Sequence, residues 1–166
     1  MAAPQGTICF HQCGDALFFQ IEGWATIGQS LPFRRFVERS LKGITRKLWV
    51  DLRQCTYLDS TFLGTLLFIQ RASSRLAGCE FRLLSPSPEC ACLFRQMGVA
   101  EVFQILLRDE PAVPAWTPLC KDADDQPGLQ HTVLQAHEEL AKLPGPAGAS
   151  FQAVVRCLNK DINKHN

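Results

Sequence analysis

The chain has 166 residues, a formal net charge of +1 and 46% hydrophobic residues. This apolar content is enough for the core of one domain, or of a domain with an appendage, and no apolar run reaches the ~18 residues of a membrane helix. Charges of both signs are interspersed, so we expect neither nucleic acid nor membrane as a partner. The N-terminus has no basic start and no apolar core of a secretory signal, so we predict a cytoplasmic protein.

The first part of the chain predicts a hairpin followed by a helix. Residues 8–13 and 16–22 read as two strands, and Gly14-Asp15 between them is a two-residue hairpin signal. A helix is expected from about residue 29 to residue 42. The sheet therefore opens with an antiparallel pair.

Strands and helices then alternate. The pattern predicts a strand at 48–52, a loop at 53–58, a helix from residue 59 or 60 to residue 76, a strand at 80–84 and a helix at 88–97. This alternation after a hairpin predicts an α/β fold, with a mixed, mostly parallel sheet and helices packed on it.

The last third of the chain has a different composition. Prolines break regular structure at the start of this region, and two amphipathic helices are expected at 129–143 and 150–162, with a turn at 144–148. Two short helices cannot bury their own apolar stripes, so we expect them to dock on the sheet domain rather than on a second subunit. The predicted sheet domain, linker and docked helical extension span 7–107, 108–122 and 123–166.

The most informative stretch runs from Asp59 to Gly64, because it places the Ser60 hydroxyl at a helix start. A phosphate there would meet unpaired N–H donors and a favourable helix dipole. It would also add about 1.5 to 2 negative charges, enough to reject a partner that binds the bare hydroxyl. The alternative is that Asp59 and Ser60 only cap the helix, contributing about 1 kcal/mol.

Between residues 8 and 107 the chain resembles a STAS domain of the bacterial anti-sigma factor antagonist family. In that family an Asp-Ser pair opens the second helix, as Asp59-Ser60 does here. Three further segments fit the family pattern in order and spacing. They are the strand 48–52, the strand 81–84 with Ser85-Pro86, and the closing helix, glycine turn and short strand over 93–103.

The resemblance implies a protein with no catalytic residues and no cofactor. Family members bind a serine kinase of the histidine-kinase ATPase fold that otherwise holds a sigma factor, and this kinase phosphorylates the serine after the aspartate. A metal-dependent serine phosphatase restores binding. Here that serine is Ser60, with Thr61 a less favoured acceptor one step into the helix. The residues implied for partner binding are Asp59, Ser60, Thr61, Phe62, Gly64 and Thr26.

Two positions depart from the family pattern. Thr26 stands where the family has an aspartate beside the phosphosite, and Phe62 stands where many members have a small residue. Phe62 either thickens the partner surface, plugs the site or is a buried aromatic of the core. Besides the phosphorylation-switched antagonist, two readings therefore stay open. One is a constitutive scaffold or sensor module that ignores Ser60, and the other is an enzyme on a small ligand, for which convergent polar groups are missing.

No metal site is predicted. The eight cysteines lack CxxC spacing and are expected to be free, mostly as small apolar fillers. His131 and His137 are six residues apart, which places them on different helix faces. The acidic cluster Asp122, Asp124 and Asp125 lacks the glycine and distal glutamate of a calcium loop, so we expect it to complement a helix dipole.

Overall fold

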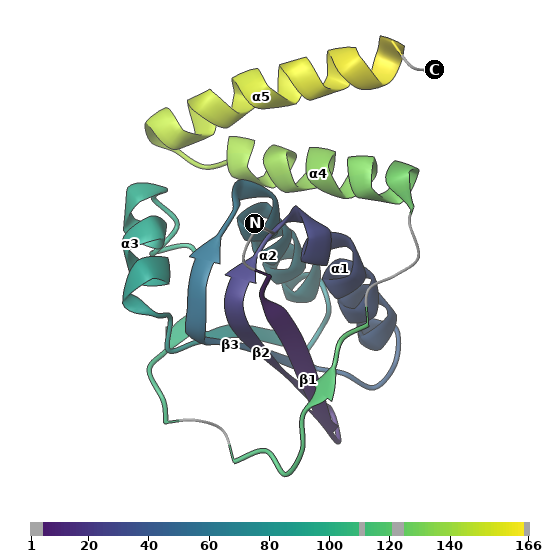
Figure 1. Ribbon diagram of the computed structural model, residues 1–166, viewed down its shortest axis with the longest axis vertical. Helices are drawn as coiled ribbons and strands as arrows, with labels where there is room; N and C mark the ends of the chain where they lie inside the picture. The colour runs from purple at the N-terminus through teal and green to yellow at the C-terminus, as the bar shows by residue number, and fades with distance from the viewer. Residues whose placement is uncertain (1–4, 110–111, 121–124, 165–166) are drawn as a thin grey trace.

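The structure is a computed structural model that describes residues 5–109, 112–120 and 125–164. It has the predicted α/β architecture, with a six-stranded mixed sheet in the order β5-β4-β3-β2-β1-β6 (Figure 1). The strands are β1 (Thr7–Cys13), β2 (Ala16–Ala25), β3 (Lys47–Leu58), β4 (Glu80–Leu84), β5 (Ile105–Leu106) and β6 (Thr117–Pro118). β1 pairs antiparallel with β2 and β6, and the other neighbours pair in parallel.

Five helices complete the described fold: α1 (Ile27–Leu41), α2 (Ser60–Ser74), α3 (Pro88–Gln96), α4 (Gln126–Ala141) and α5 (Gly145–Lys164). Both α1 and α2 lie on one face of the sheet, α4 lies across them, and α5 forms the outermost layer (Figure 1). The two predicted C-terminal helices are therefore present, and α4 docks within the chain. Across the described residues, no helix combines the length and apolar character needed to cross a membrane.

The predicted loop at 53–58 is wrong, because β3 continues without interruption to Leu58. The partner strand β2 also runs further than predicted, so that Trp24 pairs with Tyr57 and Ala25 with Leu58. The rings of Trp24 and Tyr57 lie 4.7 Å apart across this extension. Pairing with a neighbouring strand stabilises this extended segment, although residues 53–58 contain no continuous apolar run. The chain therefore passes from strand to α2 through one residue, Asp59.

Three other boundaries differ from the sequence prediction. The expected strand at 99–103 is a turn region, and the short strand β5 follows it at Ile105–Leu106. The predicted linker contains β6, which pairs with β1. Residues 145–148 of the predicted turn already belong to α5, which begins at Gly145. The proline at position 146 is tolerated because, in the first turn, it removes only an N–H that has no helical partner.

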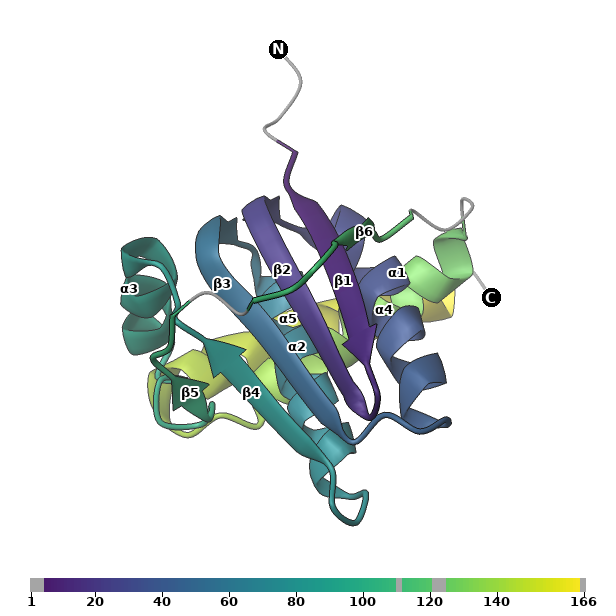
Figure 2. The same ribbon diagram turned by 90° about the horizontal axis from the view of Figure 1, so that it is seen from below.

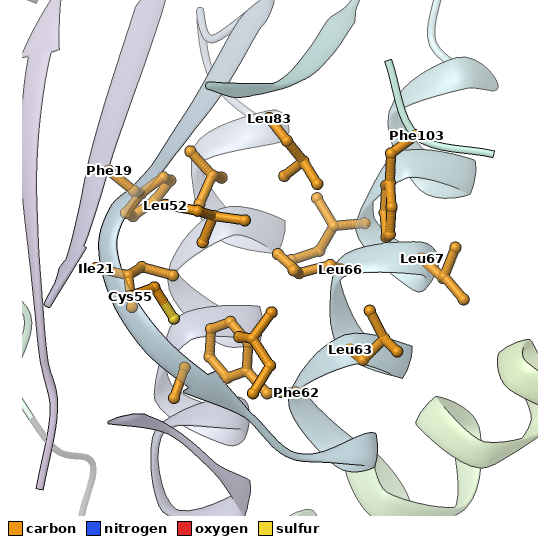
Figure 3. Close-up of a cluster of buried hydrophobic side chains, with 14 of the residues drawn as sticks. Phe19, Ile21, Leu52, Cys55, Phe62, Leu63, Leu66, Leu67, Leu83 and Phe103 are labelled. Carbon is orange, nitrogen blue, oxygen red and sulfur yellow. The ribbon is translucent and has the colours of Figure 1, made fainter. Parts of the chain in front are cut away.

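The core lies between the sheet and the α1–α2 layer (Figure 3). Phe19 of β2, Phe33 of α1 and Phe62 of α2 form a continuous aromatic contact, with ring centroids 4.8 Å apart for the first pair and 5.3 Å for the second. All three side chains are fully buried. Because Phe62 belongs to the first turn of α2, this contact anchors the start of that helix on the sheet.

Candidate functional site

A single carboxylate, that of Asp59, caps the starts of two helices. Its Oδ1 accepts a hydrogen bond from the backbone N–H of Phe62 at 2.8 Å, which makes Asp59 the N-cap of α2. Its Oδ2 accepts from the backbone N–H of Ile27, the first residue of α1, at 2.7 Å. First-turn N–H groups have no helical partner, and an anionic acceptor there also complements the helix dipole. Asp59 therefore fixes how α1 and α2 sit beside each other.

Thr26 is the N-cap of α1 and is held by its own helix. Its N–H and its hydroxyl both donate to Oε1 of Gln29, at 2.9 and 3.0 Å. The Gln29 amide donates in turn to the carbonyl oxygens of Gly6 and Trp24, at 3.0 and 3.2 Å. The carboxylate at the start of α1 thus comes from Asp59 and not from position 26.

Ser60, the first residue of α2, makes a side-chain contact with α4. Its Oγ lies 3.2 Å from Nε2 of His137. The other ring nitrogen, Nδ1, lies 2.8 Å from the carbonyl oxygen of Val133, which can only accept, so Nδ1 carries a proton. In the neutral imidazole, Nε2 then accepts the hydrogen bond that the Ser60 hydroxyl donates. The His137 side chain is buried, and its ring lies 5.8 Å from that of Phe151 in α5.

Further contacts join α4 to the same face of α2. A Cβ placed on Gly64 would lie only 2.1 Å from the carbonyl oxygen of Ala136, so only glycine permits this approach. The guanidinium of Arg71 pairs with the buried carboxylate of Glu139 at 2.7 Å. Ser60, Gly64 and Arg71 share one helical face, and we call these three residues the α4-docking face.

The remaining predicted partner-binding residues are less accessible than expected. Phe62 is fully buried in the core, so in this conformation it adds no surface for a partner, and the core alternative describes it correctly. Thr61 is also buried, which leaves its hydroxyl a poorer acceptor for phosphate than that of half-buried Ser60. Gly64 lies beneath α4. The structure therefore brings Asp59, Ser60 and Thr26 together at the helix starts but places α4 over Gly64.

The sequence analysis did not identify His137 as a site residue: it excluded a metal pair with His131 and otherwise counted His137 on the apolar side of the predicted 129–143 helix. In the structure His131 is exposed and His137 is buried against α2 and α5. The available signal was a polar ring on the otherwise apolar side of the predicted 129–143 helix. Among the described residues there is no group of three or more potential metal ligands; Asp122 and Asp124 of the acidic cluster lie outside them.

The eight cysteines are free, but half of them are exposed, so the filler prediction is wrong for Cys13, Cys92, Cys120 and Cys157. Cys55 and Cys90 are buried fillers. A hydrogen bond with the Cys90 side chain, together with burial, raises the pKa of the Cys55 thiol far above its ordinary value. That thiol is therefore inert in the folded protein.

The opposite face of the sheet carries a hollow of about 970 Å³, lined in part by Ala112, Val113 and Pro114. Figure 2 shows this face of the sheet, with residues 112–118 running across it into β6. Phe18 and Trp49 form its apolar floor, with rings 5.0 Å apart, and the Arg108 guanidinium lies 5.7 Å from the Trp49 ring. The floor residues alternate with core residues such as Phe19 along their strands, so the hollow lies on the far side of the sheet from Ser60. Ser60 and His137 do not line it.

Comparisons with known proteins agree with the observed architecture. Residues 8–111 match the family model described as STAS domain. A STAS-domain containing protein of Pseudomonas aeruginosa (strain UCBPP-PA14) is 36% identical over 93 residues, which cover 55% of this chain and 89% of that relative. Both α4 and α5 lie beyond the matched family region.

Solved structures with the same fold include anti-sigma factor antagonists. The chain is similar to SpoIIAA in its unphosphorylated form, with a TM-score of 0.55 and 17% identity, over 62% of this chain and 89% of that chain. The phosphorylated form of Bacillus SpoIIAA matches with a TM-score of 0.53. The Thermotoga maritima protein TM1081 matches with a TM-score of 0.53 and 20% identity, over 59% of this chain and 78% of that chain. At these identities the structures show a shared fold.

Proposed function

This chain belongs to the STAS domain family, and we propose that it is a protein-binding regulator of the anti-sigma factor antagonist type. In the unphosphorylated form it binds a serine kinase of the histidine-kinase ATPase fold. Phosphorylation of Ser60 ends that binding, and a metal-dependent serine phosphatase restores it. Ser60 is then a substrate residue and the chain performs no catalysis of its own.

The observation that carries this proposal is the position of Ser60. It is the first residue of α2, it follows the N-cap Asp59, and its hydroxyl is half-buried at the helix start. A phosphate at this position gains from the positive end of the helix dipole and changes the local charge by about −1.5 to −2. The solved forms of SpoIIAA, one unphosphorylated and one phosphorylated, support a switch of this kind on the shared fold.

A constitutive scaffold or sensor module is the second candidate. Thr26 supplies no charge beside Ser60, and the Ser60 hydroxyl already donates to His137. Both features favour a surface that keeps its partners whatever the state of Ser60. The two candidates differ in one property, which is whether a negative charge at Ser60 removes the partner.

A retention experiment separates them. Wild-type protein, Ser60→Asp and Ser74→Asp are immobilised and exposed to extract of the source cells, and retained kinases are identified by mass spectrometry. Ser74 is exposed at the last turn of α2, so its variant carries the same charge change at the far end of that helix. We expect Ser60→Asp alone to lose a kinase of the histidine-kinase ATPase fold by at least about tenfold. Equal retention by all three proteins would favour the scaffold.

A further inference from the structure

We propose that the α4-docking face is a helix-binding surface whose ligand in the free protein is α4 of the same chain. A partner that engages Ser60 must then displace α4, and the helix that fits in its place carries a small residue against Gly64 and a carboxylate against Arg71. The displacement step rests on the proposed function, whereas the occupancy of the surface by α4 stands independently of it.

The first observation behind this proposal is the glycine at position 64 of α2. Glycine in the middle of a helix is less favourable than alanine, so its presence needs a reason. Here the reason lies outside α2, because a Cβ on Gly64 would collide with the carbonyl oxygen, carbonyl carbon and Cα of Ala136, all within 2.8 Å. The collision is with backbone, which cannot move without moving α4. The glycine therefore serves a close approach of two helices.

Charge and hydrogen bonding make the contact specific. Glu139 is buried, and its carboxylate pairs with Arg71 of α2 at 2.7 Å and with Lys142, the C-cap residue of α4, at 2.6 Å. At the other end of the face His137 accepts from Ser60. Removing α4 would take the Glu139 carboxylate away from Arg71 and the His137 ring nitrogen away from the Ser60 hydroxyl. A competing helix must supply equivalent groups.

The same contact restricts access to Ser60. A kinase must reach the Ser60 hydroxyl, and Oγ lies 3.2 Å from Nε2 of the buried His137 ring, so the docked helix and a kinase compete for the same group. Docked α4 and modification of Ser60 are thus mutually unfavourable. Because coupling is reciprocal, whatever releases α4 also makes Ser60 easier to modify.

Hydrogen exchange of the full chain tests whether α4 occupies the α4-docking face. Gly64→Ala introduces the colliding Cβ but improves the helix propensity of α2, so the sheet domain should stay folded. Gly28→Ala in α1 is the matched control, because its Cβ meets nothing within 4 Å. We expect exchange over residues 126–141 to accelerate at least about tenfold in Gly64→Ala, with β2 and β3 still protected. Unchanged exchange of α4 in Gly64→Ala would overturn the proposal.

A peptide experiment tests whether the surface accepts a helix. Ala136→Glu places a charge at a buried position of α4 and should vacate the surface without altering it. A fluorescent peptide copying residues 125–143 should then bind Ala136→Glu at least tenfold more tightly than it binds wild type. The double variant Ala136→Glu with Gly64→Ala should bind no peptide, because the added Cβ blocks the surface. The peptide carrying Glu139→Lys should lose binding, while the Glu138→Lys peptide should keep it. Failure of the peptide to bind folded Ala136→Glu would refute the helix-binding surface.

Protein concentration distinguishes the source of the helix. Protection of α4 in wild type should be the same at low and high concentration if the helix comes from the same chain. Protection that rises with concentration would assign the surface to a second copy's α4 and overturn the proposal. None of these measurements uses a kinase or phosphate. Absence of a phosphorylation switch would therefore leave their outcome unaffected, and failure of α4 docking would leave the switch standing.

Discussion

Replacing Asp59 should destabilise the fold more than an ordinary helix cap does, because its carboxylate serves two helices. The hydrogen bond from Phe62 N–H at 2.8 Å is a normal N-cap bond, which is typically worth about 1 kcal/mol. The bond from Ile27 N–H at 2.7 Å adds a second charge-assisted bond, worth about 1.5–3 kcal/mol. We therefore expect Asp59→Ala to lower the free energy of unfolding by about 2.5–4 kcal/mol.

Two companion variants make this prediction specific. Asp59→Asn keeps one carbonyl acceptor but turns an amide NH₂ toward the other N–H donor, so it should cost about half as much as Asp59→Ala. Asp15→Ala removes a carboxylate from an exposed surface pair with Lys47 at 3.5 Å, and should cost less than about 1 kcal/mol. Urea denaturation followed by circular dichroism measures all three. An Asp59→Ala loss no larger than that of Asp15→Ala would refute the double-cap argument.

Three further variants or treatments test other parts of the structure. Phe62→Ala empties a fully buried aromatic site and should cost about 3–5 kcal/mol in urea denaturation, against a much smaller loss for the exposed Tyr57→Ala. Alkylation followed by peptide mass spectrometry should modify the four exposed cysteines of the native protein, whereas Cys55 and Cys90, which are buried, should react only after unfolding. The hydrogen bond from Gly128 N–H and the Arg35 guanidinium lower the pKa of Asp125 below its ordinary value of 3.8. The ionised Asp125 carboxylate therefore stabilises the fold above pH 3.8, and this stabilisation is lost as the pH falls through the lower pKa of the folded state. The urea midpoints of wild type and Asp125→Asn should therefore differ at pH 6, and the difference should shrink as the pH falls below 3.8; a difference that stays constant would contradict this account.

Local sequence signals were sufficient where a segment's own pattern decides its structure. The hairpin at Gly14-Asp15 and the strand Glu80–Leu84 were predicted at or near their observed bounds, because turn chemistry and apolar runs are local properties. The N-cap at Asp59 was also predictable, since the side chain bonds to a residue three positions along.

The remaining features depend on distant parts of the chain. Residues 53–58 look like a loop on their own, and only pairing with the end of β2 makes them a strand. The second bond of Asp59 reaches Ile27, 32 positions away, and the contact of Ser60 reaches His137, 77 positions away. Gly64 gave no local sign that a backbone would pack against it. Such contacts depend on how the elements assemble.

The fold also explains how a departure from the family pattern is accommodated. Thr26 brings no carboxylate to the start of α1, but Asp59 reaches across from the start of α2 and accepts from Ile27. The helix start still has an anionic acceptor, so the departure leaves the local architecture intact. We therefore expect the effect of Thr26 to fall on partner recognition rather than on the fold.

The most direct test of the proposed switch is to locate phosphate on the protein purified from its own cells, with Ser60→Ala and Thr61→Ala versions beside it. Mass spectrometry of the segment 54–71 should find phosphate in wild type and Thr61→Ala, and none in Ser60→Ala. A segment that stays unmodified under both growth and stress, or phosphate that persists in Ser60→Ala, would contradict the switch and leave the constitutive scaffold as the better account.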